Sequence, residues 1–203
     1  STLPITGLAK ASSRPDNFIG MHFFSPVDRM PLVEIILGEG TSPETLARAM
    51  DYVMAIRKTP IVVNDSRGFY TSRVFATYVR EGLALLAEGV APPLIENAGK
   101  MAGMPVGPLA MADEVSIDLM YKIGTQTRTD LGDDYVEMPG DDLVQRMVED
   151  LGRIGKKAGK GFYDYPEKGS KRLWPGLGEE CPPAAKQPDV EDVKKRLMYI
   201  QSV

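Results

Sequence analysis

The sequence predicts an α/β segment followed by an all-helical segment, and three observations support this. Two nearly uninterrupted apolar runs, at residues 18–24 and 32–37, are typical of strands covered on both faces. A helical pattern and a third apolar run at 60–63 follow, which gives the strand–helix–strand order of α/β proteins. Beyond Arg67 and Gly68 the apolar residues recur at helical spacing.

Each of the first two predicted strands contains one polar residue that stands out. The run at 18–24 is interrupted by His22 and ends before Ser25-Pro26. The run at 32–37 is interrupted by Glu34 and ends before a Gly-Glu-Gly turn. Polar side chains inside buried strands need partners, so both residues are candidates for a specific role.

The helices are predicted from caps and spacing. Ser42 is a suitable N-cap, with Pro43 at the first helical position, and Gly89 is placed to end a later helix. The other helical patterns cover 69–88, 93–103, 109–124 and 141–153, with a turn at 104–108 and an extended aromatic end at 161–165. Residues 166–189 have the composition of a linker, and a new helix begins near Val190.

Composition excludes several classes of protein. The chain has 203 residues, 43% of them hydrophobic, which is enough for one large or two small folded domains. A net charge of −4 disfavours a nucleic-acid binder. One Cys and one His leave no disulfide framework and no Cys/His metal cluster. Any imidazole chemistry in this chain must therefore use His22.

His22 has two interpretations. It can be a core histidine whose ring bonds to a backbone carbonyl. Alternatively, Glu34, twelve positions later in the next strand, is its partner. A carboxylate at one ring nitrogen fixes the tautomer and favours the imidazolium, which leaves the other nitrogen free to take a proton.

Hydroxyl groups and one basic turn are further candidates. Ser1 or Thr2 can cap a helix that begins nearby, and Thr71 and Ser72 can either cap the long helix or face a ligand. The turn at 155–161 is rich in Gly and Lys, so it is either a solvated turn or a phosphate cradle. No G-x-S-x-G, G-x-G-x-x-G or G-x-x-x-x-G-K-[ST] motif occurs.

Together, these residues resemble a known family. The stretches Arg-Pro-Asp-Asn-Phe-Ile-Gly-Met-His-Phe-Phe-Ser-Pro-Val at 14–27 and Met-Pro-Leu-Val-Glu-Ile-Ile at 30–36 resemble the catalytic region of (S)-3-hydroxyacyl-CoA dehydrogenases. Arg-Gly-Phe at 67–69, Gly-Met-Pro-Val-Gly-Pro at 103–108 and Gly-Lys-Gly-Phe-Tyr-Asp-Tyr at 159–165 extend the resemblance over about residues 1–165.

The resemblance implies NAD-dependent oxidation of 3-hydroxyacyl-CoA in fatty-acid β-oxidation. His22 matches the general base and Glu34 its carboxylate partner. Ser1 matches a serine near the hydroxyl and carbonyl of the substrate. Ser25 and Ser72 stand where the family usually has Asn, and serine has a shorter reach.

The resemblance also implies three regions. Residues 1–66 match the C-terminal part of the NAD-binding Rossmann domain, and 67–165 match the helical C-terminal domain. Residues 166–203 are expected to be a linker and the start of a second helical copy. The chain begins at a serine and stops within a helical pattern, so we expect a piece of a longer enzyme. Its Gly-rich NAD loop would lie upstream, and the 203 residues alone would be inactive.

The tail resembles the cytoplasmic, multifunctional β-oxidation enzymes of bacteria. Those enzymes have a hydratase domain upstream and a thiolase subunit as partner, and the helical domain forms a homodimer. One alternative is a non-catalytic helical dimerisation or assembly module, with Phe75, Val79 and Leu86 on its dimer face. Another is an inactive dehydrogenase-like protein, in view of the two Ser-for-Asn replacements.

Overall fold

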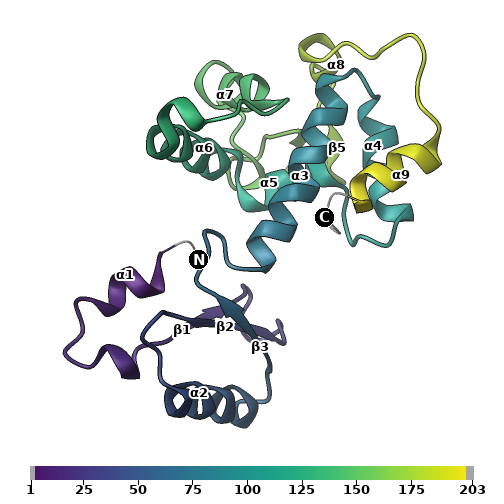
Figure 1. Ribbon diagram of the computed structural model, residues 1–203. Coiled ribbons are helices and arrows are strands. Elements are labelled where there is room, and N and C mark those ends of the chain that lie inside the picture. Colours follow the sequence, from purple (N-terminus) through teal and green to yellow (C-terminus); the bar gives the residue numbers. More distant parts are fainter. Residues whose placement is uncertain (1–2, 200–203) are drawn as a thin grey trace. The chain divides into compact units, whose positions relative to one another are not determined.

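The computed structural model describes residues 3–199 of the chain (Figure 1). Their backbone divides into two compact units, of which the first ends at Phe75 and the second begins at Ala76. The first unit contains a small sheet and two α-helices, and the second is built mainly of helices. The structure thus has the predicted fold class, an α/β segment followed by a helical one.

The sheet of the first unit has three strands in the order β1-β2-β3. Strand β1 (Gly20–Phe23) runs antiparallel to β2 (Leu32–Leu37), which runs parallel to β3 (Thr59–Asn64). Helix α2 (Pro43–Ala55) connects the two parallel strands. The predicted strands and the strand–helix–strand order are confirmed.

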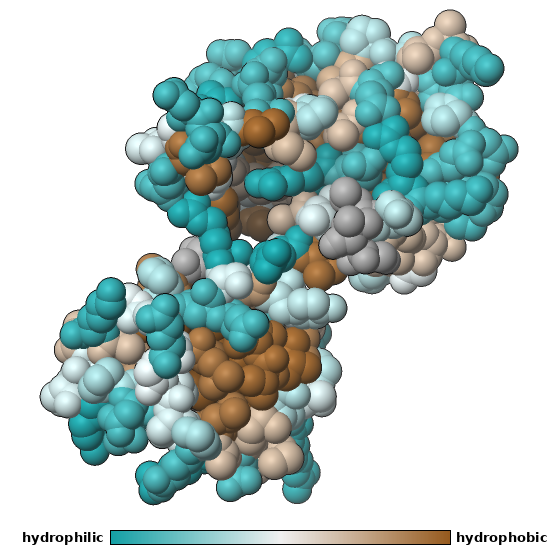
Figure 2. Space-filling model, viewed as in Figure 1, coloured by the Kyte–Doolittle hydropathy of each residue, from teal (hydrophilic) through white to brown (hydrophobic). Residues whose placement is uncertain are grey.

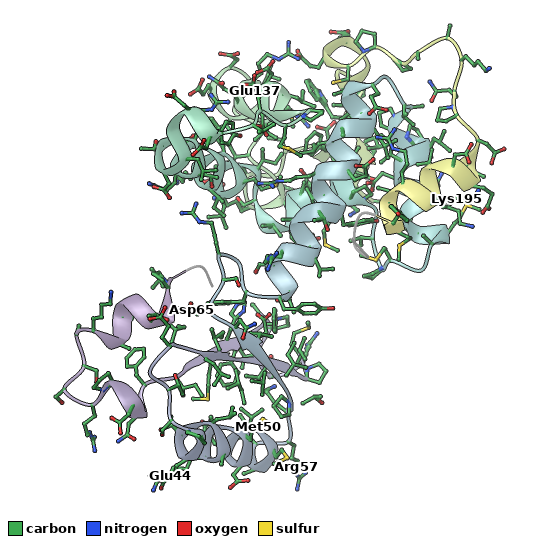
Figure 3. All side chains as sticks on the ribbon, viewed as in Figure 1. Glu44, Met50, Arg57, Asp65, Glu137 and Lys195 are labelled. Carbon is green, nitrogen blue, oxygen red and sulfur yellow. The ribbon has the colours of Figure 1, made fainter. Side chains whose placement is uncertain are left out.

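Helix α2 packs on one face of this sheet. The Ser42 side chain accepts a hydrogen bond from the amide of Thr45, which confirms the predicted N-cap. Val33 and Ile35 of β2 form a buried cluster with two residues of α2, Ala49 and Val53. In Figure 3, Met50 lies on the side of α2 that faces the sheet, and Glu44 lies on the outer side.

Helix α1 (Ile5–Ala9) packs near the other face, where Ile5, Ile36 and Phe69 are buried together. A short helix, η1 (Pro15–Asn17), precedes β1. Pro4 occupies the N-cap position of α1 and offers no side-chain acceptor, so the acceptor for the first amides of the helix must come from elsewhere in the chain. Ser1 and Thr2, expected as possible caps, lie outside the described residues.

The cap of α1 is Asp65, which directly follows β3. Its Oδ1 accepts from the amide of Ile5 at 3.0 Å, and its Oδ2 accepts from the amide of Thr6 at 2.7 Å. Figure 3 labels Asp65 near this helix. Burial acts to raise the pKa of the Asp65 carboxyl, but the hydrogen bonds together outweigh burial and lower the pKa.

The longest helix, α3 (Thr71–Ala87), begins in the first unit and continues into the second. The other elements of the second unit are α4 (Pro92–Met101), α5 (Pro108–Val115), α6 (Ile117–Leu131), η2 (Gly132–Asp134), α7 (Asp141–Glu149), η3 (Lys156–Ala158), β4 (Tyr163–Asp164), β5 (Arg172–Leu173), α8 (Leu177–Glu180) and α9 (Val190–Tyr199). The pattern at 109–124, expected to be one helical region, is two helices because Ser116 adopts a φ of +93°.

Residues 166–189 are more ordered than a linker. This segment contains β5 and α8, and Leu177 in α8 is 1% exposed. The Gln187 side chain accepts from the amide of Ala91 and donates to the carbonyl of Gly89. Gly89 has a φ of +83° and ends α3 as predicted, and a Cβ there would lie 2.9 Å from the amide nitrogen of Ala184.

The helical unit contains two glycine motifs, at 103–108 and 159–165, and a different buried carboxylate packs against a glycine of each. Glu96, 3% exposed, accepts from the amide of Leu109 at 2.7 Å and from the hydroxyl of Tyr163 at 2.6 Å. A Cβ on Gly107 would overlap the Glu96 carboxylate. The Gly-Met-Pro-Val-Gly-Pro motif therefore needs glycine at this position to admit a buried acid.

The second buried carboxylate, Asp113, is 1% exposed. It accepts from the amides of Phe162 and Tyr163 at 2.8 and 2.9 Å and from the hydroxyl of Tyr165 at 2.9 Å. Burial raises the pKa of Asp113, and these donors only partly offset it. A Cβ on Gly161 would overlap the Asp113 carboxylate, so the aromatic end of the domain is fixed on this acid.

The surface of the described residues is largely polar, with separate apolar areas (Figure 2). One such area lies over the first unit. Among the apolar residues of its sheet, Met21 on β1 and Val62 on β3 are 40% and 43% exposed. Within residues 3–199, no helix is both long and apolar enough to cross a membrane.

Candidate functional site

The register of β1 and β2 brings His22 and Glu34 together. The two residues are directly opposite each other in the antiparallel pair. His22 Nδ1 lies 2.7 Å from Glu34 Oε2, a charge-assisted hydrogen-bonding distance. Glu34 is 0% exposed, whereas the His22 side chain is 17% exposed. The pair is thus a buried carboxylate behind a partly accessible imidazole.

The other carboxylate oxygen of Glu34 binds the start of α3. Oε1 accepts from the amide of Tyr70 at 3.0 Å and from the amide of Thr71 at 2.8 Å. Gly68 and Phe69 precede these amides with φ values of +79° and +49°, so the chain makes a left-handed turn there. This turn directs both amides at the carboxylate.

Glu34 is held in its ionised form. Burial alone would raise the pKa of its carboxyl, but the hydrogen bonds from the Thr71 amide, His22 and the Tyr70 amide outweigh burial and lower it. An ionised carboxylate is only an acceptor, so His22 Nδ1 must be the donor in this pair. The neutral imidazole then has an unprotonated Nε2.

Aromatic rings surround the imidazole. The ring centroid of His22 lies 4.6 Å from that of Phe24 and 5.9 Å from that of Phe69. These rings limit the positions that the imidazole can take, while its partial exposure leaves access from outside. The arrangement can therefore take a proton at Nε2 and stabilise the imidazolium through Glu34.

The other predicted site residues are placed as follows. Ser72 lies in the first turn of α3, directly after Thr71, and is partly exposed. Ser25 is exposed and follows β1 by two residues. Ser1 lies outside the described residues. Within residues 3–199, a hydrogen bond joins His22 to Glu34, and neither Ser25 nor Ser72 is hydrogen-bonded to this pair.

The basic turn at 155–161 is ion-paired. Lys156 Nζ lies 2.8 Å from Glu114 Oε1, and Lys157 Nζ lies 2.7 Å from Asp118 Oδ1. Hydrogen bonds from Lys157 and Ser116 lower the pKa of Asp118 to about 2. These ion pairs favour the interpretation as a solvated turn over the phosphate cradle. Across residues 3–199, no cluster of three His, Cys, Asp or Glu residues is suited to a metal ion.

Sequence reasoning missed the backbone donors of Glu34. The amides of Tyr70 and Thr71 carry no side-chain signal, because any residue other than proline supplies an amide. The one available signal was Gly68 in the Arg-Gly-Phe motif, since a glycine before a helix indicates a turn with positive φ. The link between Asp65 and α1 spans about sixty residues and has no sequence pattern.

Comparison with family models gives two matches. Residues 1–66 match the model of the 3-hydroxyacyl-CoA dehydrogenase NAD binding domain. Residues 68–165 match the model of the 3-hydroxyacyl-CoA dehydrogenase C-terminal domain.

Two curated relatives are named fatty acid oxidation complex subunit alpha. The protein of Shewanella amazonensis is 46% identical over 171 residues, which are 84% of this chain and 24% of the relative. That of Shewanella loihica is 43% identical over 173 residues, which are 85% of this chain and 24% of the relative. The chain thus spans about a quarter of the length of these relatives.

Several solved structures have a similar fold. The (S)-3-hydroxybutyryl-CoA dehydrogenase PaaH1 from Ralstonia eutropha is 37% identical, with a TM-score of 0.74. The match covers 82% of this chain and 59% of the Ralstonia chain. The Escherichia coli 3-hydroxybutyryl-CoA dehydrogenase has 31% identity and a TM-score of 0.74, over 84% of this chain and 36% of that one. The dehydrogenase part of multifunctional enzyme 1 from Caenorhabditis elegans has 27% identity and a TM-score of 0.68, over 98% of this chain and 45% of that one.

Proposed function

Because the chain belongs to the 3-hydroxyacyl-CoA dehydrogenase family, we propose that it supplies the catalytic base for NAD-dependent oxidation of (S)-3-hydroxyacyl-CoA to 3-oxoacyl-CoA in fatty-acid β-oxidation. The observation that carries this proposal is the bond between His22 Nδ1 and Glu34 Oε2. That bond leaves Nε2 of the only histidine in the chain available as a base.

The proposed mechanism places the proton on His22. Its Nε2 takes the proton of the substrate's 3-hydroxyl while the C3–H bond breaks and the C3–O bond becomes a carbonyl. NAD, when bound, supplies the hydride acceptor for this step. Glu34 remains ionised and stabilises the imidazolium through Nδ1. General-base help of this kind contributes about 10²–10⁴ in rate.

Two serines are proposed to orient the substrate. Ser72 directly follows Thr71 in the first turn of α3. Because the Thr71 amide donates to Glu34, the partner of His22, the start of α3 is fixed near the proposed base. We assign Ser1 to the same task, because it matches the serine of the family's catalytic region. Ser25 lies two residues beyond β1 and is exposed, and we assign it no part in orienting the substrate.

The residues of this chain suit the chemistry that NAD requires at the substrate, but they lack the usual motif that binds the dinucleotide. His22 and Glu34 suit the proton transfer that accompanies hydride loss. The 203 residues contain no G-x-G-x-x-G motif, which is the usual cradle for the pyrophosphate of a dinucleotide. We therefore expect the chain alone to bind NADH weakly and to be inactive, which a fluorescence titration of NADH checks.

The proposal is tested with His22→Ala in the full-length protein, using acetoacetyl-CoA and NADH as substrates. We expect turnover to fall by about 10²–10⁴. Met21→Ala is the matched control, because Met21 is the neighbouring residue on β1 and is 40% exposed. Near-normal turnover by His22→Ala would exclude His22 as the base. Absence of turnover in the unchanged full-length protein would instead favour the inactive dehydrogenase-like alternative.

A homodimer through the helical domain is the second part of the proposal. Val79 and Leu86, expected on a dimer face, are 1% and 0% exposed, so that assignment is wrong and both belong to the core. Helix α6 is the better candidate face. Of its fifteen residues Ile117 is buried, whereas Leu119 and Ile123, one turn apart, are 45% and 38% exposed.

Sedimentation of the purified chain tests the dimer. We expect a dimer that dissociates when Leu119→Asp and Ile123→Asp are combined. Tyr52→Asp is the control, because Tyr52 is an equally exposed apolar residue on α2. A concentration-independent monomer of the unchanged chain would contradict the dimer and, with it, the assembly-module alternative.

The wider context is also a proposal. The relatives are named as subunits of a fatty acid oxidation complex, which supports a cytoplasmic bacterial enzyme with a thiolase subunit as partner. We retain the division into 1–66, 67–165 and 166–203 as part of this proposal, the last being a linker and the start of a second helical copy. Within 166–189, Leu177 is buried and Gln187 is hydrogen-bonded to Ala91. Only the other residues of this segment can therefore serve as a linker.

A further inference from the structure

The hydroxyl of Thr71 is a buried polar group at the start of α3. Its Oγ1 is buried, and within residues 3–199 it has no hydrogen-bond partner. Buried hydroxyl groups nearly always have a partner, because an unpaired donor loses its bonds to water without compensation. An unpaired hydroxyl beside a proposed catalytic pair therefore requires an explanation.

The position of Thr71 places this hydroxyl next to Glu34. The amide of the same residue donates to Glu34 Oε1 at 2.8 Å. The hydroxyl also contributes to lowering the pKa of the Glu34 carboxyl, although it lies outside hydrogen-bond geometry. Glu34 accepts three bonds, two at Oε1 and one at Oε2, so a carboxylate with about four lone-pair sites has room for one more.

We propose that Thr71 is a positioning residue that sets the basicity of His22 through Glu34, by turning its hydroxyl onto the carboxylate as a fourth donor. A further donor draws negative charge away from Oε2. The carboxylate then stabilises the imidazolium less strongly, so His22 gives up its proton more readily after each turnover. This role rests on the proposed function of His22, but its test does not depend on activity.

The surroundings favour this role over contact with substrate. Oγ1 is excluded from the surface, whereas a substrate-binding group needs access. The charged residues closest to this turn in sequence are Asp65, Arg67 and Arg73. Asp65 is engaged by the amides of α1, and the main influences on the pKa of Glu34 are burial and the donors of Thr71, His22 and Tyr70.

The neighbouring strands add no titratable group to this position. On the face of the sheet that carries the pair, Ile36 follows Glu34 on β2, and Ile61 is the residue of β3 opposite Glu34. The rings packed on His22 belong to Phe24 and Phe69. A change in the donors of Glu34 should therefore be detectable at His22, to which Glu34 is hydrogen-bonded.

The test uses the fact that the chain has one histidine, so one imidazole signal in its NMR spectrum belongs to His22. The midpoint of that signal against pH is measured for the unchanged chain, Thr71→Val and Thr71→Ser. We expect Thr71→Val to raise the midpoint by about half a unit to one unit, as loss of one hydrogen bond predicts. Thr71→Ser keeps the hydroxyl and should restore the original midpoint.

Two controls make the result interpretable. Glu34→Gln should lower the midpoint, which shows that the signal responds to the carboxylate. Thr59→Val, at an exposed position of β3, should leave it unchanged. Thr71→Ala provides the same comparison if Thr71→Val does not fold.

An unchanged midpoint in the folded Thr71 variants would overturn the inference. Failure of the proposed function has a different signature, because it would appear as near-normal turnover of His22→Ala in the full-length protein. The two outcomes are independent, since one concerns the titration of the imidazole and the other its need in the reaction.

Discussion

Glu34 connects the catalytic proposal to the fold at the scale of a single residue. One of its oxygens orients His22, and the other binds two amides at the start of α3. A buried carboxylate with three donors stays ionised, and an ionised carboxylate fixes the imidazole in one tautomer. The same side chain therefore determines where α3 begins and which nitrogen of His22 can act as a base.

Glu34→Gln tests this dependence in the full-length protein. The glutamine oxygen can accept from the Tyr70 and Thr71 amides, and its NH₂ then faces His22 Nδ1. Nδ1 must become an acceptor, so the proton moves to Nε2 and the base is lost. We expect turnover to fall by about 10²–10⁴ while folding is retained. The measurement is acetoacetyl-CoA reduction with NADH, followed by absorbance.

Glu44→Gln is the control for charge, because Glu44 is exposed on α2 and pairs there with Arg48. It should leave turnover unchanged. If Glu34→Gln kept more than about half of the turnover, the tautomer would not govern the reaction, and the general-base role would lose its physical basis.

At the level of residues, the sequence predicted the pair but not its surroundings. His22 and Glu34 stood out because each is a polar interruption of an apolar strand, and the structure places them opposite each other. The Tyr70 and Thr71 amides could not be predicted, and the Thr71 hydroxyl was expected to cap the helix or face a ligand rather than to lie beside Glu34. Their roles depend on the left-handed turn at Phe69, a residue type that rarely adopts positive φ.

At the scale of elements, α1 depends on a cap supplied from far along the chain. Asp65→Ala removes the acceptor of two amides at the N-terminus of α1. We expect the free energy of unfolding of the first unit to fall by about 1 kcal/mol. Urea unfolding followed through the His22 NMR signal measures it, since His22 lies in that unit.

Asp51→Ala is the matched control, because Asp51 is an exposed acid on α2. Asp65→Asn should have a smaller effect than Asp65→Ala, since an amide oxygen still accepts one hydrogen bond. Equal stability of Asp51→Ala and Asp65→Ala would show that the cap contributes nothing to α1.

The buried acids of the helical unit make a second prediction for an element. Gly161→Ala places a Cβ on the Asp113 carboxylate, so the end of the domain must shift. We expect a loss of about 1–3 kcal/mol in the free energy of unfolding of the second unit. Trp174 is the only tryptophan, and the Arg153 guanidinium stacks 4.1 Å from its ring, so tryptophan fluorescence reports this region.

Gly124→Ala is the control within the same unit. A Cβ there meets no atom within 4 Å, and the residue lies inside α6, so alanine should raise stability by up to about 1 kcal/mol. A Gly161→Ala chain as stable as Gly124→Ala would contradict the packing described for Asp113.

The helices were predicted from caps and spacing with good success, and each of the failures has a physical cause. Ser42 and Gly89 mark helix ends by recognisable chemistry, and the structure confirms both. The break between α5 and α6 falls at Ser116, where a serine adopts a φ of +93° and gives no glycine signal. The order in 166–189 comes from long-range contacts such as that of Gln187, which composition does not reveal.

At the scale of the whole molecule, the first unit should be sensitive to acid. Glu34 and Asp65 have pKa values below their ordinary 4.5 and 3.8, so the folded state binds fewer protons than the unfolded one. Their contribution to stability is complete above about pH 4.5 and is lost as the pH falls through the lowered values.

Urea unfolding of the first unit at a series of pH values measures this loss. The double variant Glu34→Gln with Asp65→Asn should show a flatter dependence on pH below about 4.5, although it is less stable at neutral pH. An unchanged slope in the double variant would mean that other carboxylates cause the acid sensitivity.

The fold class followed from periodicity, whereas the activity rests on one pair of residues within it. The most direct measurement of that pair is the ¹⁵N NMR spectrum of the single imidazole in the 203-residue chain near neutral pH. We expect the neutral ring to be protonated at Nδ1, with Nε2 unprotonated and free to act as the base. A neutral ring protonated at Nε2 would contradict this expectation.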